Sequence, residues 1–245
     1  MTVVVPDPWL SALLGKSAGR LKLGDRPDSE TYRALLTEAA FEFCDVRVPT
    51  EQTDCLRDLQ RLGFYVVDTT VTLELLAQHS VPLMTDESGA AIRTSSGDAA
   101  EAEAIAELGA CSFHYSRFHL DPAIPDRVAN QIKAEWARNC CLGKRGDRCF
   151  VAYKDNSPTG FLAALLGQEG EQYVATIDLI AVDELLRGRG FGCALVAAFA
   201  SLYRERQARL RVSTQVANIP ALRFYQRLGF VVARSAYVLH YHADV

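Results

Sequence analysis

Residues 173–182 (YVATIDLIAV) and the turn Arg187-Gly188-Arg189-Gly190-Phe191-Gly192 decide the fold of this chain. The first stretch is apolar and rich in β-branched residues, which predicts a strand. The glycines predict a tight turn, and the apolar run after them predicts a helix that reaches residue 207. Backbone N–H groups converge at such a turn, and Arg187 and Arg189 add positive charge beside it. The pattern indicates a diphosphate site, and a turn that closes for packing alone is the alternative.

Further strands and helices surround this turn. Apolar periodicity and turn residues mark their positions in the sequence. In chain order they are helices at 101–109 and 126–141, strands at 148–153, 159–166 and 209–216, a helix opened by Pro220 and ended by Gly229, and strands at 231–232 and 237–241. The predicted fold class is therefore α/β (α+β).

Composition excludes several classes of protein. The 245 residues carry a net charge of −4, which argues against a nucleic-acid binder that depends on bulk positive charge. No apolar run is long enough to span a membrane, and the N-terminus MTVVVPDPWL lacks the features of a secretory signal. Seven cysteines without a CxxC pair predict reduced, mostly buried thiols in a cytoplasmic protein.

The N-terminal part contains a partial copy of the C-terminal end. At a shift of 166 positions, Leu56-Arg57 matches Leu222-Arg223, and residues 60–64 (QRLGF) match residues 226–230. The first copy has Leu59 where the second has Tyr225, and no glycine-rich turn precedes it. We expect this copy to be structural, whether it is a true repeat or a common packing solution.

A polar stretch separates the two copies. Residues 84–100 are rich in Gly, Ser, Thr and Asp and show no apolar periodicity. The sequence therefore predicts an accessory domain at 1–84, a linker at 85–100 and a main domain at 101–245.

The glycine turn resembles the acetyl-CoA pyrophosphate loop of the GNAT superfamily of N-acetyltransferases. Arg187, Gly190 and Gly192 match its Arg/Gln-x-x-Gly-x-Gly/Ala pattern, and Asn218, Tyr225 and Gly229-Phe230 follow in the order typical of that family. The resemblance covers residues 101–245. It implies the GNAT fold, with a central mixed, mostly antiparallel, twisted sheet flanked by helices and a smaller N-terminal α/β domain as a partial GNAT unit. It also implies acetyl-CoA as the co-substrate.

Within the superfamily the chain is similar to the TDP-fucosamine (dTDP-4-amino-4,6-dideoxygalactose) N-acetyltransferases. The similarity lies in Ser116-Arg117-Phe118, residues 210–218 (LRVSTQVAN) and Ser235-Ala236-Tyr237. It implies acetyl transfer to the amine of a nucleotide-linked deoxyamino sugar by direct attack in a ternary complex, with no nucleic-acid or membrane partner. A homodimer stays open, as do two alternatives. One is acetylation of a protein N-terminus, an aminoglycoside or a polyamine, and the other is an inactive CoA-binding module.

The resemblance assigns roles in cofactor binding and catalysis to particular residues. The expected cofactor-binding residues are Ile180, Ala181, Val182, Arg187, Gly188, Arg189, Gly190, Phe191, Gly192 and Asn218. Asn218 can equally be a turn residue ahead of the helix that Pro220 opens. Tyr225 is the expected general acid, because a phenol in contact with a departing thiolate can protonate it. Simple packing is the alternative role for Tyr225.

The general base and the acceptor site are less determined. Asp178 is one candidate base, and His114, His119 or a water relay are the others. The segment 113–120 (FHYSRFHL) supplies the expected acceptor-binding residues, which are His114, Tyr115, Arg117 and His119. Such side chains suit a phosphate-bearing substrate, although the segment can also be a structural loop. His240 and His242 share a strand face, but the spacing offers no further ligand, so no metal site is predicted.

Overall fold

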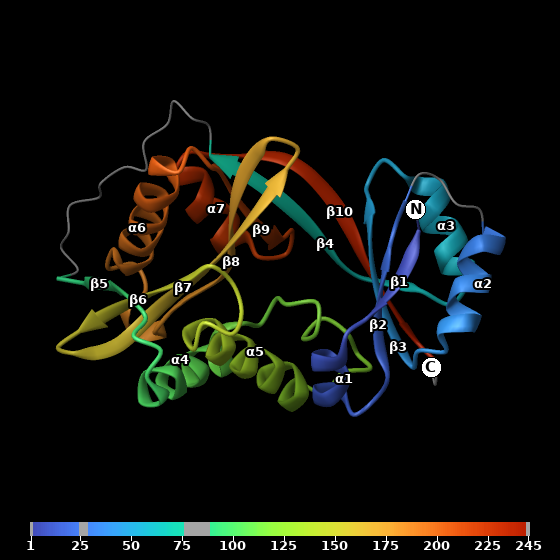
Figure 1. The fold of residues 1–245 in the computed structure, drawn as a ribbon, viewed down its shortest axis with the longest axis horizontal. Helices are drawn as coiled ribbons and strands as arrows, with labels where there is room; N and C mark the ends of the chain where they lie inside the picture. The colour runs from blue at the N-terminus through green and yellow to red at the C-terminus, as the bar shows by residue number, and fades with distance from the viewer. Residues whose placement is uncertain (1, 25–28, 76–88, 244–245) are drawn as a thin grey trace.

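The computed structural model describes residues 2–24, 29–75 and 89–243. In these residues one sheet of ten strands runs in the order β1-β2-β3-β10-β4-β9-β8-β7-β6-β5 (Figure 1). The strands are β1 (Val3–Pro6), β2 (Ala18–Lys22), β3 (Phe43–Pro49), β4 (Tyr65–Leu75), β5 (Ala91–Thr94), β6 (Arg148–Lys154), β7 (Ser157–Glu169), β8 (Gln172–Val182), β9 (Arg209–Gln215) and β10 (Phe230–His242). The helices are α1 (Pro8–Leu14), α2 (Ser29–Ala39), α3 (Thr53–Arg61), α4 (Ala99–Ser112), α5 (Asp126–Cys141), α6 (Phe191–Glu205) and α7 (Ile219–Arg227), with a 3-10 turn η1 (Glu184–Leu186).

The sheet is mixed and mostly antiparallel, as predicted. Within the described chain, β2 pairs with β3 and β8 pairs with β9 in parallel, and every other neighbouring pair is antiparallel. Side chains alternate across the strands, so each face has its own core. One core packs β6–β9 against α6 and α7, and another packs β6–β8 against α4 and α5.

Most of the predicted elements are present. Helix α5 has the predicted bounds, and the two strands predicted at the C-terminus are one continuous strand, β10. The predicted linker 85–100 contains the edge strand β5, which pairs with β6, and the start of α4. Residues 85–88 of that linker lie outside the described residues.

The internal similarity seen in the sequence is a structural repeat. The 166-residue shift carries β3 (43–49) onto β9 (209–215) and α3 (53–61) onto α7 (219–227), and the first and last residues of these elements coincide. Strand β2 is parallel to β3 as β8 is parallel to β9, so the relationship extends to the preceding strand. We call β2–β4 with α2 and α3 the N-terminal unit, and β8–β10 with α6 and α7 the C-terminal unit.

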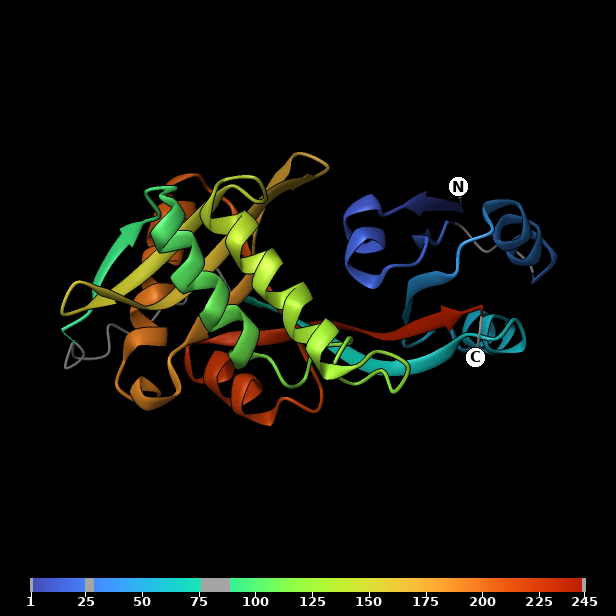
Figure 2. The same ribbon diagram turned by 90° about the horizontal axis from the view of Figure 1, so that it is seen from below.

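The two units exchange their last strands. Strand β4 of the N-terminal unit lies between β9 and β10, and β10 of the C-terminal unit lies between β3 and β4. In Figures 1 and 2 these two long strands run side by side and join the two lobes of the molecule. The exchange is symmetric: Thr70 pairs with its own repeat equivalent, Ala236, and bulges interrupt the ladder at the equivalent residues Val67 and Ala233.

Two further expectations from the sequence can be compared with the structure. All seven cysteines are free, and four of them are buried. No helix in the described part of the chain has the length and apolar character needed to cross a membrane.

Candidate active site

A gap opens in the sheet between β8 and β9. The two parallel strands pair only from Val174 to Ile177 on β8 and from Arg209 to Val212 on β9. Beyond that point β8 stays with β7 up to Val182, and β9 stays with β4 up to Gln215. The facing edges of the two strands therefore separate, and their backbone groups become available to an extended ligand.

A cavity occupies this gap and gathers most of the predicted reactive groups. Its lining includes Asp178 and Ile180 from β8, Asn218 and Tyr225 from the N-cap and the last turn of α7, and His114 from the loop after α4. A bulge in β8 at Asp178 interrupts its pairing with β7. Bulges redirect side chains, and here the affected residue lines the cavity.

The glycine turn lies at the same end of β8. Gly188 and Gly190 have φ values of +78° and +91°, in the region that favours glycine. An added Cβ at Gly188 would meet open space, whereas one at Gly192 would come within 3.3 Å of the Phe224 ring. Gly190 is the N-cap of α6 and makes no side-chain hydrogen bond to the first turn. The N–H groups of that turn therefore have no partner within the helix. The turn can therefore hold an anion.

The side chains of the turn differ in their surroundings. Arg187 and Arg189 are exposed, and the Arg187 Nε donates to the Val182 carbonyl over 3.3 Å. Phe191 is the first residue of α6, and its side chain is buried in the core, so only its backbone faces the turn. Ala181 is buried, while Ile180 and Val182 are partly exposed at the end of β8.

Two residues of α7 have well-defined local roles. The Asn218 Oδ1 accepts a hydrogen bond from the Ala221 N–H over 3.2 Å, so Asn218 caps the helix and also lines the cavity. Tyr225 is buried between Phe224 and Phe230, and burial raises its pKa. Its phenol is therefore protonated over the physiological range, in the form that donates a proton.

Asp178 is held by two donors. Trp136 Nε1 donates to it over 2.8 Å, and Arg145 Nε donates to the same carboxylate oxygen over 3.0 Å. Lys133, which the sequence analysis missed, also lines the cavity, and its ammonium lies 4.6 Å from the centre of the Trp136 ring. Burial lowers the pKa of Lys133 to about 8, and the charge of Arg117 acts in the same direction. The sequence did contain a signal for Lys133: it lies four residues from both Ala129 and Ala137, which places it on the buried face of α5.

The predicted acceptor segment divides into two groups. His114 and Tyr115 are exposed and line the cavity. In the part of the chain that the structure describes, neither Arg117 nor His119 lines the cavity. Arg117 is buried and pairs with Asp45 of β3 at 2.9 Å. His119 uses both ring nitrogens, towards Ser116 Oγ and Asn130 Oδ1, and burial lowers its pKa.

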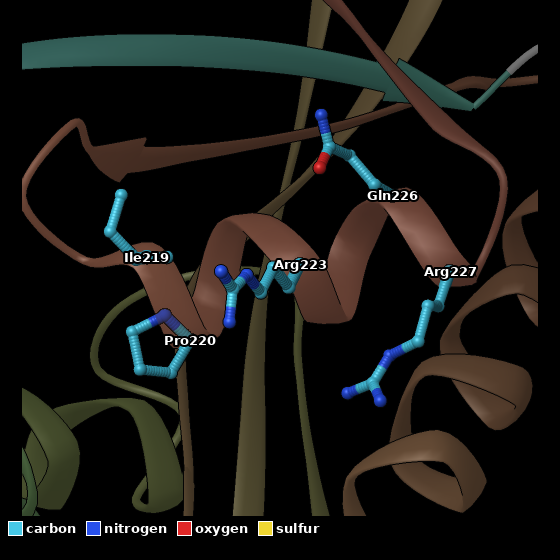
Figure 3. A pocket seen from close by; sticks show the side chains of 5 residues that line it. All are labelled: Ile219, Pro220, Arg223, Gln226 and Arg227. Atoms are coloured by element: carbon cyan, nitrogen blue, oxygen red, sulfur yellow. The ribbon is translucent and has the colours of Figure 1, made fainter.

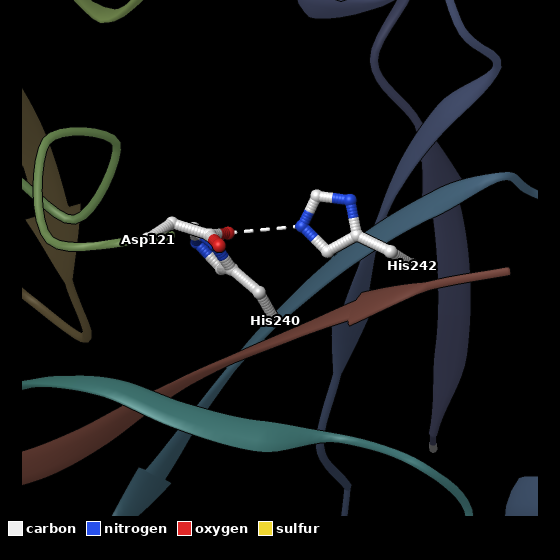
Figure 4. Close-up of side chains that lie close together, drawn as sticks. All are labelled: Asp121, His240 and His242. Carbon is white, nitrogen blue, oxygen red and sulfur yellow. Dashed lines mark hydrogen bonds and ion pairs between the residues drawn. The ribbon is translucent and has the colours of Figure 1, made fainter. Parts of the chain in front are cut away.

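A buried polar cluster anchors the end of this segment. Asp121 lies between His240 Nδ1 at 2.6 Å and His242 Nε2 at 2.9 Å, and the Tyr65 hydroxyl also donates to it (Figure 4). Sequence spacing placed the two histidines together but could not show Asp121, which is 119 residues away from His240. Arg117 Nη1 lies 3.3 Å from His240 Nε2, so a cation here would meet a buried guanidinium. The geometry is that of a hydrogen-bonded network that joins the loop to β10.

A shallow groove runs along the outer side of α7. Ile219, Pro220, Arg223, Gln226 and Arg227 line it (Figure 3). Burial raises the pKa of Cys193 in the first turn of α6, and the positive charge of Arg227 in the groove partly offsets this.

Residues 111–230, which contain the turn, the gap and Tyr225, match the Acetyltransferase (GNAT) family. The chain carries a GNAT acetyltransferase domain. The family assignment made from the glycine turn is confirmed, because the match contains the whole predicted motif from Arg187 to Phe230.

Two relatives align with the GNAT domain and the N-terminal unit together. A Bacillus subtilis protein named spore coat polysaccharide biosynthesis protein SpsD is 28% identical over 242 residues, which cover 95% of this chain and 80% of the relative. The dTDP-fucosamine acetyltransferase of Escherichia coli is 27% identical over 241 residues, which cover 97% of each chain. The similarity to this group expected from the sequence is thus confirmed over nearly the full length.

Solved structures share the fold. A Staphylococcus epidermidis protein of unknown function superposes with a TM-score of 0.64 at 15% identity, covering 92% of this chain and 84% of that one. A tandem GNAT protein from the clavulanic acid biosynthesis pathway gives a TM-score of 0.62 at 16% identity, covering 92% and 75%. The two-unit arrangement therefore has a counterpart among solved GNAT proteins.

Proposed function

We propose that this protein transfers the acetyl group of acetyl-CoA to the amine of a nucleotide-linked deoxyamino sugar, by direct attack in a ternary complex. The observation that carries the proposal is one cavity in the β8–β9 gap, next to the glycine turn and lined by Tyr225 and Asp178. The names of the two full-length relatives support a sugar acceptor. Residues 101–245 would carry the chemistry and residues 1–84 would form an accessory domain.

The cofactor would lie along the gap. The backbone amides from Gly188 to Gly192 and the α6 N-terminus suit its pyrophosphate, with Arg187 and Arg189 beside it. The separated edge of β8 from Ile180 to Val182 suits the pantetheine arm, and an amide near Ile180 suits the thioester carbonyl. The Asn218 amide group keeps its N–H donors available for the same arm, because only its Oδ1 is used in the cap.

The chemistry then needs two proton transfers. The acceptor nitrogen attacks the thioester carbon, the carbon–sulfur bond breaks, and Tyr225 gives its proton to the departing thiolate. The proton lost by the amine goes to Asp178, His114 or water. Asp178 lines the cavity but is already bonded to Trp136 and Arg145, which favours a water relay over direct abstraction.

An acceptor screen tests this proposal. Thiol release from acetyl-CoA would be followed with nucleotide-linked amino sugars, free amino sugars, aminoglycosides, polyamines and peptides with a free N-terminus. We expect the highest kcat/KM with a nucleotide-linked amino sugar and a much lower value with the free sugar. Preference for a peptide or an aminoglycoside would refute the acceptor class. Saturable acetyl-CoA binding without turnover on any amine would instead support the inactive CoA-binding module.

A further inference from the structure

A polar strip of the sheet leads from the cavity towards the N-terminal unit. Ser213 and Gln215 of β9 line the cavity, and they pair with Thr72 and Thr70 of β4. The hydroxyl oxygens of Thr72 and Ser213 are 3.0 Å apart. Paired residues of neighbouring strands share a face, so the polar face of β9 continues beyond the cavity onto the buried Thr70 and Thr72 of β4.

The strip ends in a carboxylate and a guanidinium. Val238 of β10 is the cross-strand partner of Asp68 on β4 and also of Arg47 on β3. The three residues therefore lie on one face of three adjacent strands, with the two charges on either side of Val238. The opposite face of β3 is apolar and packs Val46 and Val48 into the core of the N-terminal unit.

Asp68 has hydrogen-bonding capacity that the protein leaves unused. Its side chain is buried, and its Oδ2 is the one buried side-chain oxygen or nitrogen in the described residues without a hydrogen-bond partner. Burial raises the pKa of Asp68 to about 6, while hydrogen bonds from the Thr69 N–H and the Gln215 side chain act in the opposite direction. A buried acceptor without a donor is unfavourable, so this oxygen calls for a donor that the described part of the protein does not supply.

Arg47 is a cation on the same face, with an exposed side chain. The neighbouring protein still desolvates its guanidinium enough to lower its pKa, and the charge of Arg20 acts in the same direction. The nearby carboxylates already have partners. Asp45 pairs with Arg20 and Arg117, and Asp178 pairs with Arg145.

Positive charge is in excess around the strip. The positive charges of Arg47, Arg117 and Arg145 all act to lower the pKa of Lys133, while Asp178 acts to raise it. The charged groups coupled in this region are the cations Arg20, Arg47, Arg117, Lys133 and Arg145 and the carboxylates Asp45, Asp68 and Asp178. Such an excess of cations favours an anionic ligand, and a guanidinium suits phosphate.

We propose that the Asp68–Arg47 strip is the distal half of the acceptor site. Arg47 pairs with a phosphate of the acceptor, and the free Asp68 oxygen accepts a hydrogen bond from an O–H or N–H group of the same molecule. The ligand class is a nucleoside diphosphate carrying a hydroxyl-rich or amino-bearing group. The N-terminal unit thus contributes recognition through two side chains. The inference builds on the proposed acetyl transfer, but its binding step can be measured separately.

A calorimetric titration tests the Arg47 contact. Thymidine diphosphate is the probe, and the protein is first saturated with CoA so that the glycine turn is occupied. We expect saturable binding to the wild type and a loss of at least about tenfold in affinity for Arg47→Ala, since the variant lacks the charge-assisted hydrogen bond to the phosphate. Arg57→Ala, on the exposed side of α3, is the matched control and should bind like the wild type. Arg47→Gln and circular dichroism guard against a folding defect.

Steady-state kinetics distinguish a role of Asp68 in acceptor binding from a purely structural role. For Asp68→Asn we expect the acceptor KM to rise about tenfold with the KM for acetyl-CoA unchanged, while Asp54→Asn on α3 changes neither. Absence of diphosphate binding to the CoA-saturated wild type, or wild-type affinity in Arg47→Ala, would overturn the inference. Binding that depends on Arg47 without acetyl transfer to any amine would refute the proposed function and leave the strip intact. Acetyl transfer with a wild-type acceptor KM in both Arg47→Ala and Asp68→Asn would refute the role of the strip and leave the proposed function intact.

Discussion

The N-terminal and C-terminal units build the same scaffold and differ where a cofactor would lie. In each unit a parallel strand pair is followed by a helix, a Gly-Phe step and a long strand, and Phe64 and Phe230 are both buried in the core of their own unit. In the C-terminal unit β8 continues past its pairing with β9, up to Val182. In the N-terminal unit β2 ends at Lys22, one residue after its pairing with β3.

Side chains at equivalent positions close the gap in one unit and leave it open in the other. Ala221 lies near the C-terminal cavity, and its equivalent is Cys55, whose Sγ is 3.1 Å from the hydroxyl of the fully buried Tyr32. Tyr225 lines the cavity, whereas its equivalent Leu59 is fully buried in an apolar core. The same scaffold is therefore closely packed at these positions in the N-terminal unit and lines a cavity at the equivalent positions in the C-terminal unit.

The units also depend on each other through the exchanged strands. Leu73 and Leu75 of β4 are buried in the core of the C-terminal unit, and Leu239 of β10 is buried in that of the N-terminal unit. Leu73 and Leu239 are repeat equivalents, so each unit gives the other the same core residue. Either unit alone would lose an interior strand.

Removing residues 1–88 should have the largest effect. Strands β9 and β10 would each lose their β4 partner, and two buried leucines worth about 1.5–3 kcal/mol each would leave the core. We expect an aggregated or unfolded chain by size-exclusion chromatography and circular dichroism. Co-expression of residues 1–88 should restore a soluble protein. A monomeric 89–245 chain with cooperative unfolding would contradict the interdependence of the units.

Gly190→Val should abolish acetyl-CoA binding while the fold is retained. Position 190 has a φ of +91°, which a β-branched residue adopts only with strain, and the new side chain would crowd the amides of the turn. The measurement is a calorimetric titration with acetyl-CoA. Gly167→Val is the matched control, because position 167 is exposed on β7 with open space around it. Wild-type affinity in Gly190→Val would remove this turn from the cofactor site.

Tyr225→Phe should lower kcat by about 10²–10⁴ and leave the KM for acetyl-CoA nearly unchanged, because it deletes one proton donor and keeps the ring. Tyr32→Phe makes the same change in the N-terminal unit, at a buried tyrosine outside the cavity, and should keep wild-type kcat. Steady-state kinetics on both variants would compare the units directly. Turnover of Tyr225→Phe within a few-fold of the wild type would reduce Tyr225 to a packing residue.

The sequence predicted local elements better than their arrangement. Helix α5 and strand β9 follow from apolar periodicity and turn residues, and the glycine turn identified the family. The exchange of β4 and β10 could not be predicted in this way, because the repeat has the same local pattern whether each strand pairs within its own unit or with the other. Strand β5 was missed because its four residues, Ala91–Thr94, lie in a polar stretch and form only an edge.

The candidate site shows the same division. Residues near one another in sequence, such as those of the glycine turn, were found by their spacing. Lys133, Asp68 and Arg47 were not, because their significance comes from burial and from contacts between distant parts of the chain. Asp121 shows the limit most clearly: two histidines on β10 gave a partial signal, and their partner lies on a loop that only the fold brings close.

The smallest expected effect concerns this Asp121 network, which joins the end of the predicted acceptor segment to β10. Burial lowers the pKa of His240 to about 4 from its ordinary 6.5, and the hydrogen bond to Asp121 only partly offsets this. Between pH 6.5 and 4 the unfolded chain therefore binds a proton at His240 that the folded chain does not. The free energy of unfolding should fall as the pH drops through this window, by roughly 2 kcal/mol from pH 7 to pH 5 for this residue.

His240→Asn removes that proton uptake. The variant should be less stable than the wild type at pH 7, because the bond to Asp121 is disturbed, but its stability should depend less on pH. Urea denaturation at pH 7 and pH 5 measures the difference, and His114→Asn, at an exposed position, should keep the wild-type dependence. Equal losses in wild type and His240→Asn would mean that His240 is already protonated in the folded state. The Arg117–His240–Asp121 contact would then need a different charge assignment, since a protonated imidazole cannot accept a hydrogen bond from a guanidinium.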